Sequence, residues 1–184
     1  MKTPFDPQAE ITPVILAGGE GRRLRPLTSP DRPKPFLKLF GGRSLLQATA
    51  LRCAGFGPPV VVCAKRYGGR ALQDFDDIHV KPKRIVLEPV ARSTAPALAL
   101  AALGLDADAF MLVCPSDHVI GDSDAFIRGE RAAGRAAGGD HIAFLAVRPD
   151  RAATRYGYIR CKPAKNGVHD VLCFTEKPDV RRAK

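Results

Sequence analysis

The residues best suited to chemistry gather in one stretch, LAGGEGRRLRPLTSPDRPKPFL, at positions 16–37. It holds three glycines, four arginines and a lysine, and it begins at the end of an apolar run at 11–17. Glycine lets backbone N–H groups approach an anion without a Cβ in the way, and a guanidinium can grip phosphate oxygens through two bonds. The spacing matches neither a P-loop, which needs Lys-Ser or Lys-Thr, nor a dinucleotide fingerprint, since Leu24 stands at the third glycine position. The stretch predicts a phosphate-binding loop, and the alternative is an ordinary solvated glycine turn.

Two further places carry charged groups next to apolar runs. Asp117 follows the run MLVCPS, where a carboxylate at a strand end suits a ligand site but could also cap a turn. Glu176 and Lys177 follow a run near the end of the chain, and as an exposed charge pair they would contribute little to stability. His118 is interpreted as a structural residue.

The elements that position these residues follow from the apolar pattern. Continuous apolar runs at 11–17, 59–64, 84–87, 109–114 and 142–147 predict buried strands of a parallel sheet. Between them, helices are expected from the capping box at Ser44, over 67–77, from Thr94 as the cap to 103, and from 122–123 to about 137. The segments 156–161 and 168–175 predict two strands joined by a turn. Alternating strands and helices indicate an α/β fold, a doubly wound, Rossmann-like, mostly parallel sheet flanked by helices.

The amino-acid composition limits the classes of function that the chain can have. The chain has 184 residues, a net charge of +10 and 45% hydrophobic residues, which is typical of a globular domain that prefers anionic partners. Five cysteines without a CxxC pair indicate reduced thiols rather than disulfides or zinc. The N-terminus lacks the apolar core of a signal peptide, and no apolar run approaches the ~20 residues of a membrane span. We therefore expect a cytoplasmic protein without a membrane partner, and the charge alone gives only weak support for nucleic-acid binding.

The ordered motifs resemble one enzyme family. The stretch 16–37 is similar to the LAGGxGxRLxPLT…PKPxL signature of sugar-1-phosphate nucleotidyltransferases. The segments 37–47, 88–97, 115–118, 156–159 and 174–178 look like those of the mannose-1-phosphate guanylyltransferases, also called GDP-mannose pyrophosphorylases. Together they cover almost the whole chain in the expected order. The resemblance implies transfer of a nucleotidyl group from GTP to mannose 1-phosphate with Mg²⁺, giving GDP-mannose and pyrophosphate.

The same resemblance assigns roles to individual residues. Arg23 and Lys34 would hold the leaving pyrophosphate, Lys177 the sugar phosphate, and Asp117 the Mg²⁺. The nucleotide-binding set it implies is Leu16, Ala17, Gly18, Gly19, Gly21, Glu88, Arg92, Thr94 and Ala95.

On the sugar side, the resemblance implies that Gly157 leaves room for the sugar and that Glu176 accepts bonds from its hydroxyls. Departures at Arg25, Pro35 and other motif positions leave the base and sugar open. Residues 24–28 are closer to the pattern of glucose-1-phosphate thymidylyltransferases, so glucose 1-phosphate with dTTP is an alternative pair.

The family's catalytic domain continues beyond the EKP motif at 176–178, so residues 1–184 are expected to be an incomplete catalytic domain, with 1–10 a flexible N-terminal segment. A nucleotide-binding module without turnover is therefore the second hypothesis, and the oligomeric state, including a homo-oligomer, is left open.

Overall fold

The computed structural model describes residues 11–19, 21–39, 41–90, 93–138, 141–165 and 167–183. The chain divides into two compact units, the first ending at Ser123 and the second beginning at Asp124. The predicted flexible segment 1–10 lies outside the described residues. Most of the phosphate-binding candidates belong to the first unit, and the sugar-side candidates belong to the second.

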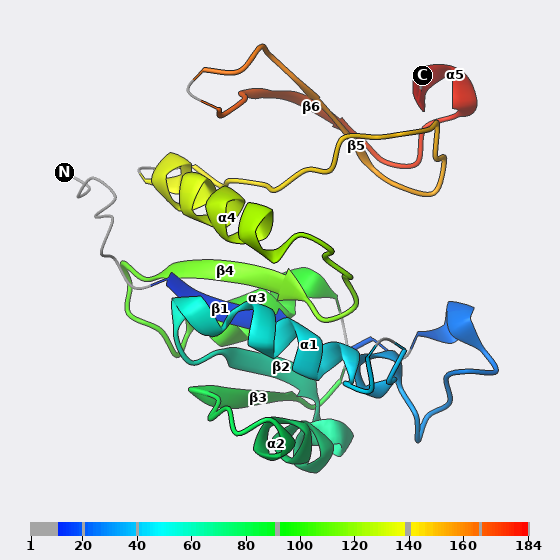
Figure 1. Ribbon diagram of the computed structural model, residues 1–184, viewed down its shortest axis with the longest axis vertical. Helices are drawn as coiled ribbons and strands as arrows, with labels where there is room; N and C mark the ends of the chain where they lie inside the picture. The colour runs from blue at the N-terminus through cyan, green and yellow to red at the C-terminus, as the bar shows by residue number, and fades with distance from the viewer. Residues whose placement is uncertain are drawn as a thin grey trace. The chain divides into compact units, whose positions relative to one another are not determined.

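The first unit is built on a parallel sheet of four strands in the order β3-β2-β1-β4 (Figure 1). Their bounds are Ile11–Leu16 for β1, Val60–Ala64 for β2, Arg84–Glu88 for β3 and Phe110–Pro115 for β4. β1 is central, and its Ile15 pairs with Val61 on β2 and with Cys114 on β4. The strand order reverses at β1, because β2 lies on one side of it and β4 on the other. This α/β arrangement confirms the predicted fold class, and four of the five predicted parallel strands are present.

Helices cover both faces of this sheet. On one face, α1 (Leu45–Arg52) and α2 (Gly68–Asp77) pack against the strands through Leu46 and Phe75, which are fully buried with Ile15. On the other face, α3 (Thr94–Ala102) buries Ala97 and Ala101 against the alternate side chains of β1 and β2. Because successive side chains of a strand point to opposite faces, a strand covered on both sides must be apolar throughout. That is why the strands read as unbroken apolar runs.

The predicted start of α1 is confirmed in detail. The Ser44 hydroxyl accepts from the Gln47 N–H at 3.0 Å, and the Gln47 side chain accepts from the Ser44 N–H at 2.9 Å. The predicted cap of α3 is wrong: Thr94 is the first helical residue, and Ser93 at the N-cap makes no side-chain cap bond. Pro96 at the third helical position has no N–H, which removes one of the two donors that a capping side chain uses.

Short 3₁₀ turns occupy the connections of the first unit, at Arg22–Leu24, Lys34–Phe36, Ala54–Phe56 and Lys65–Tyr67. The turn Lys34–Phe36 is anchored by Phe36, which is buried beside Tyr67. Tyr67 also donates a hydrogen bond from its hydroxyl to the Pro30 carbonyl at 2.8 Å. These contacts fix the segment that carries Lys34 against the start of α2.

The second unit contains α4 (Ser123–Ala137), an antiparallel hairpin of β5 (Tyr158–Cys161) and β6 (Val171–Thr175), and the short α5 (Val180–Ala183). The hairpin confirms the predicted pair of late strands. The predicted strand at 142–147 is wrong: these residues are not in a sheet, and Val147 is 90% exposed. An apolar run gives only the tendency to form a strand, and no described strand pairs with this one. Among the described residues, no helix has the length and apolar character needed to cross a membrane.

Candidate nucleotide site

Three candidate residues of the first unit lie at the carboxyl ends of its parallel strands. Gly18 follows β1, Glu88 is the last residue of β3, and Asp117 follows β4 with only Ser116 between them. In open α/β sheets, ligands bind at this edge, at the point where the strand order reverses. The sheet therefore brings together residues that are far apart in the sequence at the edge where a ligand is expected.

The glycine loop passes close to the Glu88 carboxylate. A Cβ on Gly18 would lie 3.0 Å from Glu88 Oε2, so a larger residue would crowd that oxygen. Glu88 itself is only 6% exposed. Burial, and after it the negative charge of Glu88, raises the pKa of the neighbouring Cys63 thiol to about 11. A buried carboxylate thus faces the backbone of the loop, and it can only accept hydrogen bonds while it is ionised.

Position 21 requires glycine for two reasons, which are its backbone conformation and the close approach of Lys34. Its φ of +68° lies in the left-handed region, and a Cβ there would lie 2.6 Å from Lys34 Cβ. The Gly21 carbonyl accepts from Leu24 N–H and from the Thr28 hydroxyl, each at 2.8 Å. The loop is therefore held in one shape with the stem of Lys34 against it. Sequence reasoning missed Thr28, because nothing in its spacing shows that its hydroxyl turns back seven residues.

Lys34 and Asp117 form an ion pair. Lys34 Nζ donates to Asp117 Oδ2 at 2.6 Å, and His118 Nε2 lies 4.0 Å from Asp117 Oδ1. Burial by itself would raise the pKa of Asp117, but the hydrogen bond and positive charge of Lys34 outweigh it and hold that pKa below its usual value. The carboxylate is therefore ionised at neutral pH and already binds a cation. Sequence reasoning singled out both residues but did not predict that they pair.

The remaining nucleotide candidates are less constrained. The Arg23 side chain is exposed and makes no hydrogen bond or ion pair with the described residues. The Leu16 carbonyl accepts from Ser116 N–H at 3.1 Å, and Ala17 N–H donates to the Val62 carbonyl at 2.8 Å, so these two groups extend the sheet. Gly19 has nothing within 4 Å of the position its Cβ would take.

Thr94 and Ala95 are exposed in the first turn of α3. Arg92, the remaining nucleotide candidate, lies outside the described residues. Among the described residues, Thr94 and Ala95 make no hydrogen bond to the other nucleotide candidates.

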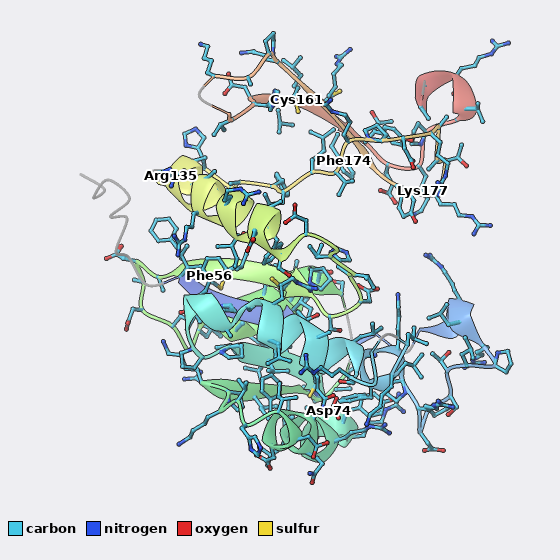
Figure 2. The ribbon with its side chains drawn as sticks, viewed as in Figure 1. Phe56, Asp74, Arg135, Cys161, Phe174 and Lys177 are labelled. Carbon is cyan, nitrogen blue, oxygen red and sulfur yellow. The ribbon has the colours of Figure 1, made fainter. Side chains whose placement is uncertain are left out.

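The sugar-side candidates meet one another in the second unit. A Cβ on Gly157 would lie 2.3 Å from Phe174 Cζ and 3.2 Å from Glu176 Oε2. Lys177, at a φ of +44°, donates from Nζ to Glu176 Oε1 at 2.5 Å. Phe174 on β6 and Lys177 just beyond it are labelled in Figure 2. The structure thus joins Gly157, Glu176 and Lys177 into one cluster, with Phe174 as a neighbour that sequence reasoning missed.

Comparison with known proteins identifies the family. Residues 12–184 match the family described as nucleotidyl transferase. The chain belongs to the nucleotidyl transferase family. Among curated relatives, the xanthan biosynthesis protein XanB of Xanthomonas campestris pv. campestris (strain B100) is 41% identical over 181 residues, covering 96% of this chain and 38% of XanB. The mannose-1-phosphate guanylyltransferase of Escherichia coli (strain K12) is 37% identical over 189 residues, covering 96% of this chain and 40% of the relative.

A solved structure of similar sequence has the same fold. The crystal structure described as mannose-1-phosphate geranyltransferase from Thermus thermophilus superposes with a TM-score of 0.81 at 35% identity, covering 95% of this chain and 52% of the other. This nucleotidyl transferase chain spans about two-fifths of the length of the two curated relatives.

The donor set around Asp117 fits a metal ion that arrives with a nucleotide. The described residues contain no group of three or more His, Cys, Asp or Glu side chains that could hold a metal by themselves. Mg²⁺ in proteins is commonly held by one or two carboxylates together with phosphate oxygens. Asp117 is ionised and contacts a cationic group in Lys34, so its carboxylate suits one ligand position of such an ion. In this nucleotidyl transferase the phosphates of the nucleotide would have to supply the other ligands of the ion.

Proposed function

We propose that this chain carries the nucleotide-binding part of a mannose-1-phosphate guanylyltransferase, which joins GTP to mannose 1-phosphate and releases pyrophosphate. The observation that carries the proposal is the Lys34–Asp117 pair at the carboxyl end of the sheet, next to a loop whose Gly21 is pressed against Lys34. The pair offers a cation for phosphate oxygens and a carboxylate for Mg²⁺ at the same place. The guanylyltransferase relative supports the choice of GTP and mannose 1-phosphate.

The chemistry requires positioning more than a reactive side chain. A phosphate oxygen of mannose 1-phosphate attacks the α-phosphorus of GTP, a P–O bond forms, and the bond to the bridging oxygen of the β-phosphate breaks in line with it. Lys34 and Arg23 neutralise the charge that builds up on the departing pyrophosphate, and the glycine loop supplies backbone donors. Mg²⁺, when bound, would supply further charge neutralisation. Asp117 would be the protein's ligand to it.

The carboxylate of Glu88 supports guanine as the base. The carboxylate oxygens of Glu88 are hydrogen-bond acceptors, and the side chain is buried beside the Gly18 backbone. Guanine presents two adjacent donors, N1–H and the 2-amino group, which match the two oxygens of one carboxylate. Uracil and thymine present a single N–H between two carbonyls, so they leave one carboxylate oxygen without a donor. We therefore expect Glu88→Gln to lower the preference for GTP over dTTP.

The cluster in the second unit supports a sugar-phosphate role. The Lys177 ammonium is a compact charge suited to the phosphate of mannose 1-phosphate, and the Glu176 carboxylate accepts bonds from sugar hydroxyls. In the structure these two side chains bond to each other, and Gly157 brings its backbone against both Phe174 and Glu176. Substrate binding would exchange the Lys177–Glu176 bond for bonds to the sugar phosphate.

A second candidate function is nucleotide binding without turnover. It uses the same glycine loop and Lys34–Asp117 pair, in a chain that spans about two-fifths of the length of the two curated relatives. In that case GTP binds with Mg²⁺, but no pyrophosphate is released.

A turnover screen separates the candidates. Purified chain is incubated with Mg²⁺, each of GTP, ATP, UTP, CTP and dTTP, and mannose 1-phosphate or glucose 1-phosphate, and pyrophosphate is measured. We expect release with GTP and mannose 1-phosphate, and a loss of about 10²–10³ in rate in Arg23→Ala, because one donor to the transition state is removed. Saturable GTP binding with no release of pyrophosphate favours the binding module. Release of pyrophosphate only with dTTP and glucose 1-phosphate would instead assign the chain the substrates of a thymidylyltransferase.

A further inference from the structure

The C-terminal end of α1 contacts the turn that carries Asp117. Arg52, the last residue of α1, donates from Nη1 to the His118 carbonyl at 3.3 Å. His118 follows Asp117 directly, so this bond acts on the backbone next to the carboxylate. Arg52 is partly buried in this position. A cationic side chain at a helix C-terminus is also favoured by the helix dipole, which gives Arg52 a second reason to stay in place.

The guanidinium of Arg52 is itself fixed from one turn earlier in the helix. Arg52 Nη2 donates to Thr49 Oγ1 at 3.0 Å, and Thr49 is fully buried. The Thr49 hydroxyl has one proton, and its shortest acceptor is the Leu45 carbonyl at 2.9 Å, against 3.5 Å to the Ser116 carbonyl. Thr49 therefore gives its proton to the helix backbone and uses a lone pair to orient Arg52. The two terminal nitrogens of the planar guanidinium thus each donate a hydrogen bond, at 3.0 Å to Thr49 and at 3.3 Å to the His118 carbonyl.

The other side of the Asp117 turn is held by the sheet. Ser116 is buried, and its N–H donates to the Leu16 carbonyl at the end of β1, where the glycine loop begins. One flanking residue of Asp117 is thus bonded to β1, and the other is bonded to α1 through Arg52. The side chain between them is directed at Lys34.

We propose that Arg52 is a positioning residue that fixes the Asp117 carboxylate through the His118 carbonyl, with Thr49 orienting its guanidinium. The proposal rests on the proposed function, in which Asp117 serves the triphosphate site, and it adds a residue that lies in a helix outside the motif loops. Arg52 acts on the site through the backbone and does not itself contact substrate. Removing it frees one side of the turn while leaving the strand and the Lys34–Asp117 partners in place.

The test combines amide hydrogen exchange with nucleotide affinity in the full chain. Arg52→Met keeps the length and apolar stem but removes the donors, and Arg52→Lys keeps a cationic donor. Thr49→Val replaces the orienting hydroxyl by a methyl group and also removes its bond to the Leu45 carbonyl. Lys81→Gln, an exposed charge beyond α2, is the matched control for loss of one positive charge. We expect amide exchange at 117–119 to rise about five- to tenfold in Arg52→Met, less in Thr49→Val and Arg52→Lys, and not in Lys81→Gln. Exchange in β2 should stay at the wild-type rate in all of them.

Calorimetric titration with GTP and Mg²⁺ is the second readout, and we expect a drop of about fivefold in affinity for Arg52→Met with partial recovery in Arg52→Lys. Unchanged exchange at 117–119, or an equal rise throughout the first unit including β2, overturns the positioning role. So does an Arg52→Lys variant indistinguishable from Arg52→Met. If the wild-type chain binds no nucleotide, the proposed function fails, whereas the exchange data still decide whether Arg52 fixes the turn.

Discussion

The ammonium nitrogen of Lys34 lies 2.6 Å from Oδ2 of Asp117, although the two residues are 83 positions apart in the sequence. Each is predicted to bind a charged group of the same ligand: Lys34 a phosphate oxygen, and Asp117 a metal ion. In the structure they neutralise each other. Binding of a nucleotide with Mg²⁺ would therefore exchange one ion pair for two new ones, which limits the electrostatic cost of keeping both charges in the site.

Lys34→Met should raise the pKa of Asp117. Burial then acts on that carboxyl without the opposing ammonium, so its pKa moves from below its usual value upward. A lowered carboxyl pKa stabilises the fold above the unfolded-state value of 3.8, and this stabilisation is lost as the pH falls. The free energy of unfolding should therefore fall less steeply at acidic pH in Lys34→Met than in the wild-type chain. Carbon-13 NMR of the aspartate carboxyls gives the titration directly. A pKa of Asp117 that does not move would show that the pair does not persist in solution.

Gly21→Ala should impair nucleotide binding, because the new Cβ would meet Lys34 Cβ at 2.6 Å and the residue would keep a φ of +68°. We expect a stability loss of about 1–3 kcal/mol from the strained backbone, and a larger loss of GTP affinity than of stability as Lys34 is displaced. Gly69→Ala, in α2 and outside the loop, is the matched control, since nothing lies within 4 Å of its Cβ position. Equal GTP affinities for the two alanine variants would contradict the account of the loop.

Gly157→Ala should affect the sugar side with little effect on stability. The Cβ would meet Phe174 Cζ at 2.3 Å, but the Phe174 ring is 62% exposed and can rotate away. We expect a stability change below about 1 kcal/mol. We also expect a several-fold rise in KM for mannose 1-phosphate, with KM for GTP unchanged. A rise in KM for GTP instead would assign Gly157 to the nucleotide.

Asp74→Asn should remove a pH dependence of stability that originates between α1 and α2. Asp74, labelled in Figure 2, is buried and accepts from the Ser44 hydroxyl, and burial raises its pKa despite that bond and the charge of Arg70. A raised carboxyl pKa means that folding favours the protonated form, so its contribution is present at low pH and is lost as the pH rises through the folded-state value. Relative to Asp74→Asn, the wild-type chain should therefore become less stable as the pH rises above the unfolded-state pKa of 3.8.

Urea unfolding at several pH values measures this difference, with Asp76→Asn, exposed on the same helix, as the control for charge removal. A constant difference between wild type and Asp74→Asn from acidic to neutral pH would contradict the assignment. Asn can still accept from the Ser44 hydroxyl, so the comparison isolates the charge from the hydrogen bond.

The sequence allowed much of the fold to be predicted, because strands covered on both faces leave a clear apolar run. β1 to β4 and the capping box of Ser44 could be read from the residues alone. The run at 142–147 could not be interpreted in the same way, because a strand also needs a partner, and pairing is not encoded in the run itself. The predicted cap of α3 was wrong for a local reason, because Pro96 has no backbone N–H and so removes a donor that the cap would use.

The site was predictable as a set of residue types but not as a set of contacts. The motif resemblance singled out Lys34 and Asp117 separately, whereas their pairing depends on the register of β1 with β4 and on the turns that follow both strands. The same holds for Arg52, which lies in a helix with an ordinary amphipathic pattern. Its bond to His118 depends on how α1 lies across the end of β4.

A crystal structure of the chain with GTP and Mg²⁺ would show directly which groups hold the triphosphate. We expect that Lys34 Nζ leaves Asp117 for an outer phosphate oxygen, that Asp117 binds the metal, and that the phosphates rest on the backbone of the glycine loop between β1 and Leu24. A triphosphate bound away from that loop, with Lys34 still bonded to Asp117, would contradict this expectation.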